Sequence, residues 1–429
     1  MQSAAAVQDA LLTLGRKRQP LQRAYRLLFN PNLFRQFATV DARLALPSLI
    51  EALRGQMFRW GGDPVQDRAL AEVLAGIIGV WLTGRGPGFV HGLAPDTGLH
   101  SALRAARAMV AGEQWVASIV VPTFDSVAGC QSKPKLSHMV QGGRFTELLS
   151  RFFDAYPVAD PESSTVFSGV LQPASLHGVC AQLALTDLDD HLESTRTALK
   201  RKRDGTVLKS LRYSNALLLA ASGNRDTATT LLAEVTAVLR GLLGSDLSGG
   251  REPRWMPWDT GSDVQFLGYR MQGREDGSAS LRSSPELMRK AARPFHRRGK
   301  PAERGDRTFL DDHRIGNLYA EEFEAVRQYY ALAEDRGPLR GFQQTLKASW
   351  ARTLAHKHRC RVNTVLDPQG DHLAAWQDSW LAKIPGTDYR MNRIEDVCIR
   401  EREQVRAGEP CAVKVARTVR REAKSLTCP

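Results

Sequence analysis

The chain has 429 residues, which is enough for two or three domains and a sizeable hydrophobic core. Its 59 Lys and Arg exceed its 46 Asp and Glu, so the net charge is +13 and the pI is about 9.7. This balance favours polyanionic partners such as nucleic acid, although a basic soluble protein without such a partner has the same composition. No apolar run reaches the ~18 residues of a membrane span, so we expect no membrane association.

The first 29 residues are amphipathic, with several Lys and Arg and few acids. A transit peptide has this composition, but so does a first helix, and we favour the helix because folded-domain sequence already begins at Gln19. Six scattered cysteines form no C-x-x-C pair, which disfavours a zinc site and favours free thiols in a reducing compartment.

Residues 1–280 carry mixed helix and strand signals. The segment Thr227–Leu243 repeats its apolar residues at helical spacing, and Leu211–Ala221 has the pattern of a strand, a turn and a buried strand. Asp263–Met271 has the pattern of another short strand. A strand pair, a helix and a returning strand predict an α+β unit.

Residues 272–310 are rich in Gly, Ser, Arg and Pro, and residues 281–300 hold seven Lys or Arg against one Glu. This composition predicts a basic linker, or a solvated surface loop with no partner.

Helical periodicity returns in residues 311–365. Around Thr345–Arg359, apolar side chains at i, i+4 and i+8 occupy one face and basic side chains occupy the opposite face. We therefore expect one face to pack and the other to meet phosphate or solvent. The segment Tyr389–Pro429 holds ten Lys or Arg against six acids, and we expect it to be partly disordered without a partner.

Eight segments, in order over roughly 340 residues, resemble group II intron-encoded reverse transcriptase/maturases. Each phrase alone is weak evidence, but their shared order is specific. They are Tyr25–Phe37 (YRLLFNPNLFRQF), Pro64–Val73 (PVQDRALAEV), His91–Arg107 (HGLAPDTGLHSALRAAR), Trp115–Val127 (WVASIVVPTFDSV), Gly169–Leu192, Arg212–Ala216 (RYSNA), Asp263–Arg270 with its FLGYR phrase, and Tyr319–Arg359, which is similar to the maturase thumb.

This resemblance implies a reverse-transcriptase-like fingers and palm in residues 1–275 and a basic linker in 276–310. It further implies an α-helical thumb, the maturase domain X, in 311–375, followed by a basic tail in 376–429. The function it implies is binding of structured RNA, above all group II intron RNA, to assist splicing. The chain lacks the paired cysteines and late histidines of the family's H-N-H endonuclease, so we expect no endonuclease.

The family's polymerase uses three Asp side chains to hold two divalent metals, and the matching positions here have changed. Counting back from Phe124, the first position is Ile119, and the RYSNA segment places the other two at Asn215 and Ala216. Ile and Ala offer no side-chain oxygen, and a neutral amide is a poor ligand for Mg²⁺. We therefore expect no catalytic residue, no metal and no cofactor; Mg²⁺ would be needed only if the site were active.

Nearby acids could in principle restore an unusual metal site, which keeps an active RNA-directed DNA polymerase as an alternative. These acids are Asp125, Asp187, Asp189 and Asp190. Other departures point to decay: Ala94 replaces the Arg of an "FRP" phrase, and Pro173 replaces the Gly of "PQG".

RNA binding asks for a basic surface and no carboxylates. The candidate residues, each of which could equally belong to a solvated charged face, are Arg16, Lys17, Arg18, Lys200, Arg201, Lys202, Arg203, Arg297, Arg298, Lys300, Lys347, Arg352, Lys357 and Arg359.

A structural role in an organellar ribonucleoprotein is the third hypothesis. Group II introns occur in organelles and bacteria, and we expect a mitochondrial, organelle-encoded protein, with plastid and bacterial cytoplasm as alternatives.

Overall fold

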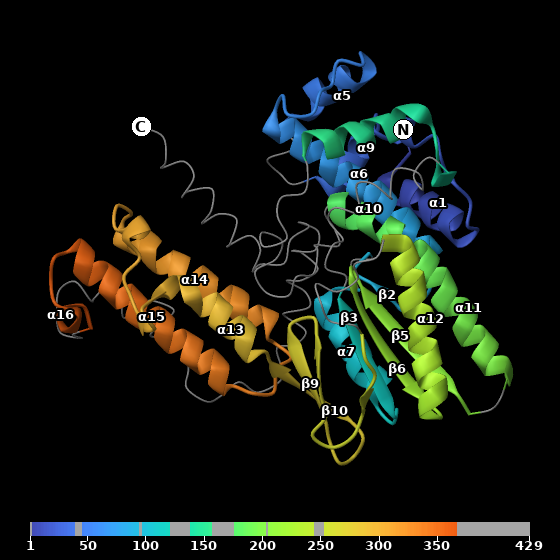
Figure 1. Ribbon diagram of the computed structural model, residues 1–429. Helices are drawn as coiled ribbons and strands as arrows, with labels where there is room; N and C mark the ends of the chain where they lie inside the picture. The colour runs from blue at the N-terminus through green and yellow to red at the C-terminus, as the bar shows by residue number, and fades with distance from the viewer. Residues whose placement is uncertain are drawn as a thin grey trace.

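The computed structural model describes residues 2–38, 45–93, 97–120, 138–156, 176–202, 205–243 and 253–366. Figure 1 shows three parts in chain order: N-terminal helices, a central sheet with its covering helices, and a helical bundle that extends away from the sheet. Buried side chains form three hydrophobic clusters, one among the N-terminal helices and one on each face of the sheet. This mixture of helices and strands is compatible with the predicted α+β class. No described helix is long and apolar enough to cross a membrane.

The long helix α6 (Pro64–Arg85) is the centre of the N-terminal part. Asp63 accepts a hydrogen bond from the Val65 amide at 2.9 Å and caps the helix. A Cβ at Gly84 would lie 2.3 Å from the Leu12 carbonyl oxygen, so only glycine permits this close approach of α1 to α6. The surrounding elements are α1 (Ala4–Arg16), β1 (Leu21–Gln22), α2 (Ala24–Leu27), α3 (Pro31–Phe37), α5 (Leu46–Arg54), β4 (Val140–Gln141), α9 (Gly143–Ala155) and α10 (Leu176–Ala184).

The central sheet has the strand order β2-β5-β6-β3-β7. On one face α7 (Leu99–Val110) packs, and on the other face α11 (Thr186–Lys202) and α12 (Arg225–Leu243) pack. Strand β6 is antiparallel to both β5 and β3, whereas β2 is parallel to β5. The strands are β2 (Val90–His91), β3 (Trp115–Val120), β5 (Val207–Tyr213), β6 (Ala216–Ser222) and β7 (Met256–Pro257).

Two sequence predictions for this part are confirmed and one is wrong. The predicted helix Thr227–Leu243 is α12, and the predicted strand, turn and strand are β5 and β6. Asp263–Met271, however, is not one returning strand. It holds β8 (Asp263–Phe266) and the start of β9 (Tyr269–Gly273), which pair with β10 (Ala279–Ser283) in a separate three-stranded sheet. The reversal occurs at Leu267 and Gly268, both with positive φ.

The helical bundle begins with α13 (Pro285–Ala292) and contains two long helices, α14 (Asp312–Tyr329) and α15 (Gly337–Lys357), followed by α16 (Val362–Leu366). The predicted apolar stripe is confirmed, because Leu346, Trp350 and Leu354 are buried.

The interpretation of residues 276–310 as a basic linker needs correction. The segment contains β10, α13 and a two-stranded hairpin, β11 (His296–Arg297) with β12 (Lys300–Pro301). Leu281, Met288 and Phe295 are buried in the same cluster as the bundle helices. The average composition of this segment is basic because its exposed side chains are cations, so composition alone does not reveal the apolar residues that it buries. The other domain boundaries stay predictions.

Candidate nucleic-acid interface

Strand pairing brings together the three positions where the family's polymerase has aspartates. Val120 of β3 lies opposite Ala216 of β6, and Ile119 lies opposite Leu217 on the next rung. Asn215 lies in the turn that precedes Ala216, beside Ser214 with its φ of +55°. All of Ile119, Asn215 and Ala216 are buried. The Ile119 side chain faces the α11 and α12 side of the sheet and the Ala216 methyl group faces the α7 side. An aliphatic side chain, a methyl group and a neutral amide do not fit a pair of magnesium ions.

A buried arginine supports the turn from within. Arg212 is 1% exposed and donates from Nε to Asp189 at 2.7 Å and from Nη2 to the other oxygen of the same carboxylate. Its Nη1 donates to Gln182 at 2.6 Å and to the Ser214 carbonyl at 2.8 Å. This bidentate contact between the guanidinium and the carboxylate compensates the charge of Asp189. Asp189 is thus held by an arginine and is a poor candidate for binding a metal.

The other acids proposed as substitutes are no better placed. Asp190 lies 3.0 Å from Arg18 and 3.6 Å from Arg85, so it joins α11 to the N-terminal helices. Asp187 is exposed on α11, and Asp125 lies outside the described residues, as does Ala94. Within the described residues, no group of three or more His, Cys, Asp or Glu could hold a metal ion.

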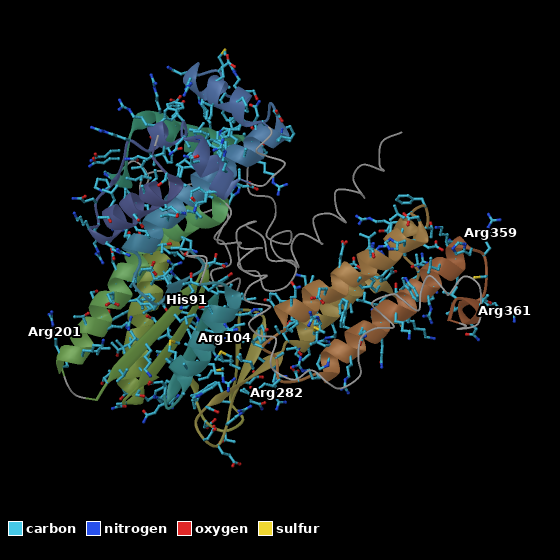
Figure 2. All side chains as sticks on the ribbon, turned by 180° about the vertical axis from the view of Figure 1, so that it is seen from behind. His91, Arg104, Arg201, Arg282, Arg359 and Arg361 are labelled. Carbon is cyan, nitrogen blue, oxygen red and sulfur yellow. The ribbon has the colours of Figure 1, made fainter. Side chains whose placement is uncertain are left out.

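The predicted RNA-binding residues lie in separate places. Arg16, Lys17 and Arg18 are exposed around the end of α1, but Arg18 already pairs with Asp190. Lys200, Arg201 and Lys202 are exposed at the end of α11, and Arg203 lies outside the described residues. Figure 2 shows Arg201 at one end of the molecule and Arg359 at the opposite end. The structure therefore does not gather the predicted residues into one surface.

Of the predicted residues, Arg297, Arg298 and Lys300 are exposed on the β11–β12 hairpin. Its turn residues, Arg298 and Gly299, have φ values of +51° and +73°, as in a tight two-residue hairpin turn. Arg297 pairs with Glu303 at 3.1 Å. This short ribbon holds its basic side chains out in solvent.

Further cations of the same segment were not among the predicted site residues. Arg282, Arg289, Lys290 and Arg293 are also exposed, and the charge run in the sequence was the available signal for them. We call the exposed cations of 282–300 the α13–β12 cationic segment; its members are Arg282, Arg289, Lys290, Arg293, Arg297, Arg298 and Lys300. In the described part of the chain, only Arg297 of these seven has an ion pair.

The cations predicted on α15 differ in their contacts. Lys347 and Arg359 are exposed, whereas Arg352 is half-buried and donates to the Ala348 carbonyl at 3.0 Å. Lys357 donates to the Leu310 carbonyl at 2.6 Å and to Asp312 at 2.7 Å. Lys357 therefore holds the loop before α14, and its charge is largely compensated.

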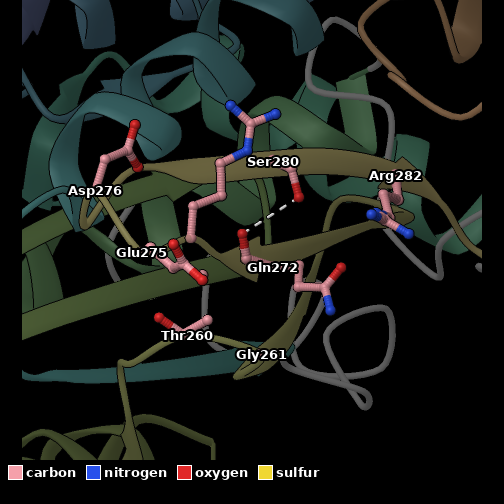
Figure 3. Close-up of a pocket in the computed structure, with 9 residues that line it drawn as sticks. Thr260, Gly261, Gln272, Glu275, Asp276, Ser280 and Arg282 are labelled. Atoms are coloured by element: carbon pink, nitrogen blue, oxygen red, sulfur yellow. Dashed lines mark hydrogen bonds between the residues drawn. The ribbon is translucent and has the colours of Figure 1, made fainter.

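A pocket of about 530 Å³ opens beside the three-stranded sheet, where Gln272, Ser280 and Arg282 line it (Figure 3). The Ser280 hydroxyl donates to the Gln272 carbonyl at 3.3 Å. Glu275 and Asp276 also line the pocket, so its charge is mixed and does not select an anion. Arg282 is the one residue that the pocket shares with the cationic segment.

Tyrosines join the bundle to the sheet region. The hydroxyl of Tyr329 donates to the Leu267 carbonyl at 2.8 Å, and that of Tyr330 donates to the Gly268 carbonyl at 3.1 Å. Burial raises the pKa of Tyr330, so its hydroxyl stays protonated and keeps its donor role. His100 of α7 lies 3.2 Å from the Tyr329 carbonyl. The end of α14 is therefore fixed to the β8–β9 turn.

Comparisons with known proteins find similarity to intron-encoded proteins. Residues 284–400, which include the bundle and part of the cationic segment, match the type II intron maturase family. The chain is also 20% identical over 362 residues to the group II intron-encoded protein LtrA of Lactococcus lactis subsp. cremoris, and the LtrA of strain MG1363 matches equally. That alignment covers 67% of this chain and 60% of the relative, so the chain spans well under the full length of LtrA. The chain is therefore similar to group II intron maturases, directly over residues 284–400 and more distantly over the longer alignment to LtrA.

Proposed function

We propose that this protein binds group II intron RNA and assists its splicing, and that its reverse-transcriptase site is degenerate. The observation that carries the proposal is the match of residues 284–400 to a type II intron maturase, in the region where exposed cations of 282–300 gather. The name of LtrA says only that it is encoded by a group II intron. Splicing assistance by this chain is therefore our inference.

We also propose that the three parts of the chain correspond to fingers, palm and thumb. The support for a palm is the antiparallel β5–β6 hairpin beside β3, with helices covering both faces of the sheet. The support for a thumb is the bundle of α13, α14 and α15, which follows the three-stranded β8–β9–β10 sheet directly in the chain.

Loss of polymerase chemistry is supported by charge. Two magnesium ions close together repel each other unless carboxylates compensate them. Ile119 and Ala216 carry no charge, and Asp189 is neutralised by Arg212 at 2.7 Å. Adding metals here would mean burying uncompensated positive charge beside a guanidinium, which is strongly unfavourable.

RNA binding is supported by the contrast between paired and exposed cations. A cation already in an ion pair gains less by meeting a phosphate, because it must first give up its partner. Lys290, Arg298 and Lys300 are exposed and have no ion pair with a described residue. Each can displace a counterion from RNA and so contribute to salt-dependent affinity.

The first experiment measures affinity for a folded group II intron RNA and for a scrambled RNA of equal length. We expect tighter, salt-sensitive binding to the intron RNA. Equal affinities at physiological salt would remove the claim of specific recognition.

Two triple variants with the same charge loss then locate the surface. Lys290→Ala, Arg298→Ala and Lys300→Ala together should lower the slope of log affinity against log salt by about two to three, at ~0.7–0.9 per lost phosphate contact. Lys200→Ala, Arg201→Ala and Lys202→Ala, at the end of α11, are the matched control and should change the slope less. Equal losses in the two triple variants would contradict a binding surface on the bundle.

Primer extension with Mg²⁺ or Mn²⁺ tests the degenerate site. We expect no extension above that of an Asp125→Ala variant, while an active group II intron reverse transcriptase extends the same primer. Extension that depends on Asp125 would support a polymerase instead. The mitochondrial location and a ribonucleoprotein assembly stay predictions; the relatives named above are bacterial.

A further inference from the structure

One aromatic side chain stands out on the bundle surface. Phe309 is 59% exposed, and it is the only aromatic among the large hydrophobic side chains of the described residues that are exposed. A single exposed apolar residue is ordinary on a protein surface, so exposure by itself is weak evidence for a binding role. The loop and the charges around Phe309 supply the further observations.

The loop that carries Phe309 is held from both sides. Arg307, two residues earlier, is 2% exposed, pairs with Glu322 and lies 4.5 Å from the ring centre of Tyr319. Leu310 packs against the core, and its carbonyl accepts the hydrogen bond from Lys357. The neighbours of Phe309 thus face the bundle, and the ring stays in solvent on a fixed backbone.

The end of α15 brings cations to this loop. His358 lies 2.8 Å from Asp312, next to the Lys357 contact, so the loop and the end of the helix touch. Arg359 and Arg361 follow, both exposed and without an ion pair among the described residues. Figure 2 shows these two arginines together at the end of the bundle. The two acids that follow this loop are occupied, since Asp312 pairs with Lys357 and His358 and Asp311 caps α14.

We propose that Phe309 stacks on an unpaired base of the bound RNA, while Arg359 and Arg361 contact the phosphates next to that base. Unpaired bases are recognised chiefly by stacking on aromatic side chains, and a nearby cation neutralises the backbone. The local charge favours RNA over an apolar protein partner, because such a partner supplies no anion to pair with the two exposed guanidinium groups. This inference rests on the proposed function and names the part of the RNA that the bundle recognises.

The position along α15 allows one RNA to reach both surfaces. The Ser349 hydroxyl donates to the Ala302 carbonyl just after β12, and Lys357 contacts Leu310. These two contacts are eight residues apart on α15, or ~12 Å at 1.5 Å per residue. The basic hairpin and Phe309 therefore lie within reach of a single folded RNA.

The test compares Phe309→Ala and Phe309→Trp with Met57→Ala, which alters another exposed apolar side chain, 71% exposed on the N-terminal part. The probes are a hairpin RNA with an unpaired loop and an uninterrupted duplex of equal length. We expect Phe309→Ala to weaken binding of the looped RNA by about five- to a hundredfold, with an unchanged salt slope, because it removes stacking and no charge. Phe309→Trp should retain affinity, and Met57→Ala should behave as the parent.

Several results would overturn the inference. They are unchanged affinity of Phe309→Ala for the looped RNA, an equal loss for the duplex, or a failure of Phe309→Trp to retain affinity while its melting temperature matches the parent. A change of oligomeric state in Phe309→Ala without any change in RNA affinity would point to protein contact and also overturn it. Failure of the parent chain to bind the looped RNA would overturn this inference alone, whereas failure to bind the folded group II intron RNA would defeat the proposed function as well, so the two failures are distinguishable.

Discussion

The β5–β6 hairpin of the sheet and the α13–β12 cationic segment at the base of the bundle treat charged side chains in opposite ways. Arg212 and Asp189 are buried together near the β5–β6 turn, and toward the other end of this hairpin the Glu113 carboxylate lies 2.5 Å from Lys209. On the bundle, the α13–β12 cationic segment stands in solvent with a single ion pair among its described residues. Charge that is internally compensated stabilises a fold, whereas exposed uncompensated charge is available for a ligand. Under the proposed function, this difference fits a scaffolding role for the sheet and RNA contact by the cationic segment.

The largest effect should come from breaking the buried pair in the sheet region. Arg212→Ala leaves Asp189 buried without the guanidinium that compensates it, which should cost about 3–5 kcal/mol of unfolding free energy. Urea unfolding measures this loss. Arg18→Ala is the control, because its pair with Asp190 is 55% exposed on the arginine side and should be worth less than ~1 kcal/mol. A similar small loss in both variants would break the comparison.

A smaller effect should come from the joint between the two regions. Gly268 has a φ of +74°, and a Cβ there would lie 2.5 Å from the Tyr329 hydroxyl. Gly268→Ala should therefore destabilise the protein by about 1–3 kcal/mol through strain and overpacking.

Gly299→Ala is the matched control for the joint. Gly299 has a φ of +73°, but a Cβ at this position would meet no heavy atom of the described residues within 4 Å, so only backbone strain applies. Thermal unfolding of both variants should show the larger loss for Gly268→Ala. Equal losses would mean that the Tyr329 hydroxyl moves aside at little cost.

The smallest effect concerns the ion pairs at the end of the bundle. Burial tends to raise the pKa of Asp312, but hydrogen bonds from Lys357 and His358 outweigh it, so the pKa of Asp312 lies below its ordinary value. A carboxyl with a lowered folded-state pKa stabilises the fold above its unfolded pKa of ~3.9, and this stability is lost as the pH falls through the folded pKa.

Asp312→Asn should accordingly lower the melting temperature slightly at pH 7. The difference from the parent should shrink as the pH falls below about 4, because the parent carboxyl is then becoming protonated. Melting curves between pH 7 and pH 3 measure this. A difference that stays constant over the range would show that the loss is steric and not electrostatic.

Periodicity predicted the elements whose apolar residues repeat regularly. The helix Thr227–Leu243 and the strand pair in Leu211–Ala221 bury their predicted faces, as does the Leu346 stripe of α15. The juxtaposition of Ile119 and Ala216 could not come from periodicity, because pairing between distant strands leaves no local trace. It came from the family resemblance. The strand register brings these backbone positions close together, and their equivalence to the family's metal-binding positions stays a prediction.

Composition gave the wrong prediction for residues 276–310, where buried apolar residues alternate with exposed cations. Seven cations in 281–300 conceal Leu281, Met288 and Phe295, which are buried. The β8–β9 reversal was missed because Leu267, a bulky residue, adopts a φ of +48° that such side chains rarely take. Ion pairing was equally hidden: nothing local in the sequence tells that Arg18 and Lys357 have partners while Arg298 has none among the described residues.

If the protein binds RNA as we propose, the tyrosines at the end of α14 also limit which RNA molecules fit it. Turning the bundle about this joint would break the Tyr329 and Tyr330 hydrogen bonds to the β8–β9 turn and uncover the buried Tyr330 ring. The angle between bundle and sheet is therefore set before any RNA arrives, and a ligand gains no affinity by adjusting it. Under the proposed function, we expect the protein to act as a template of fixed shape, which an RNA must fit at the angle that this joint sets.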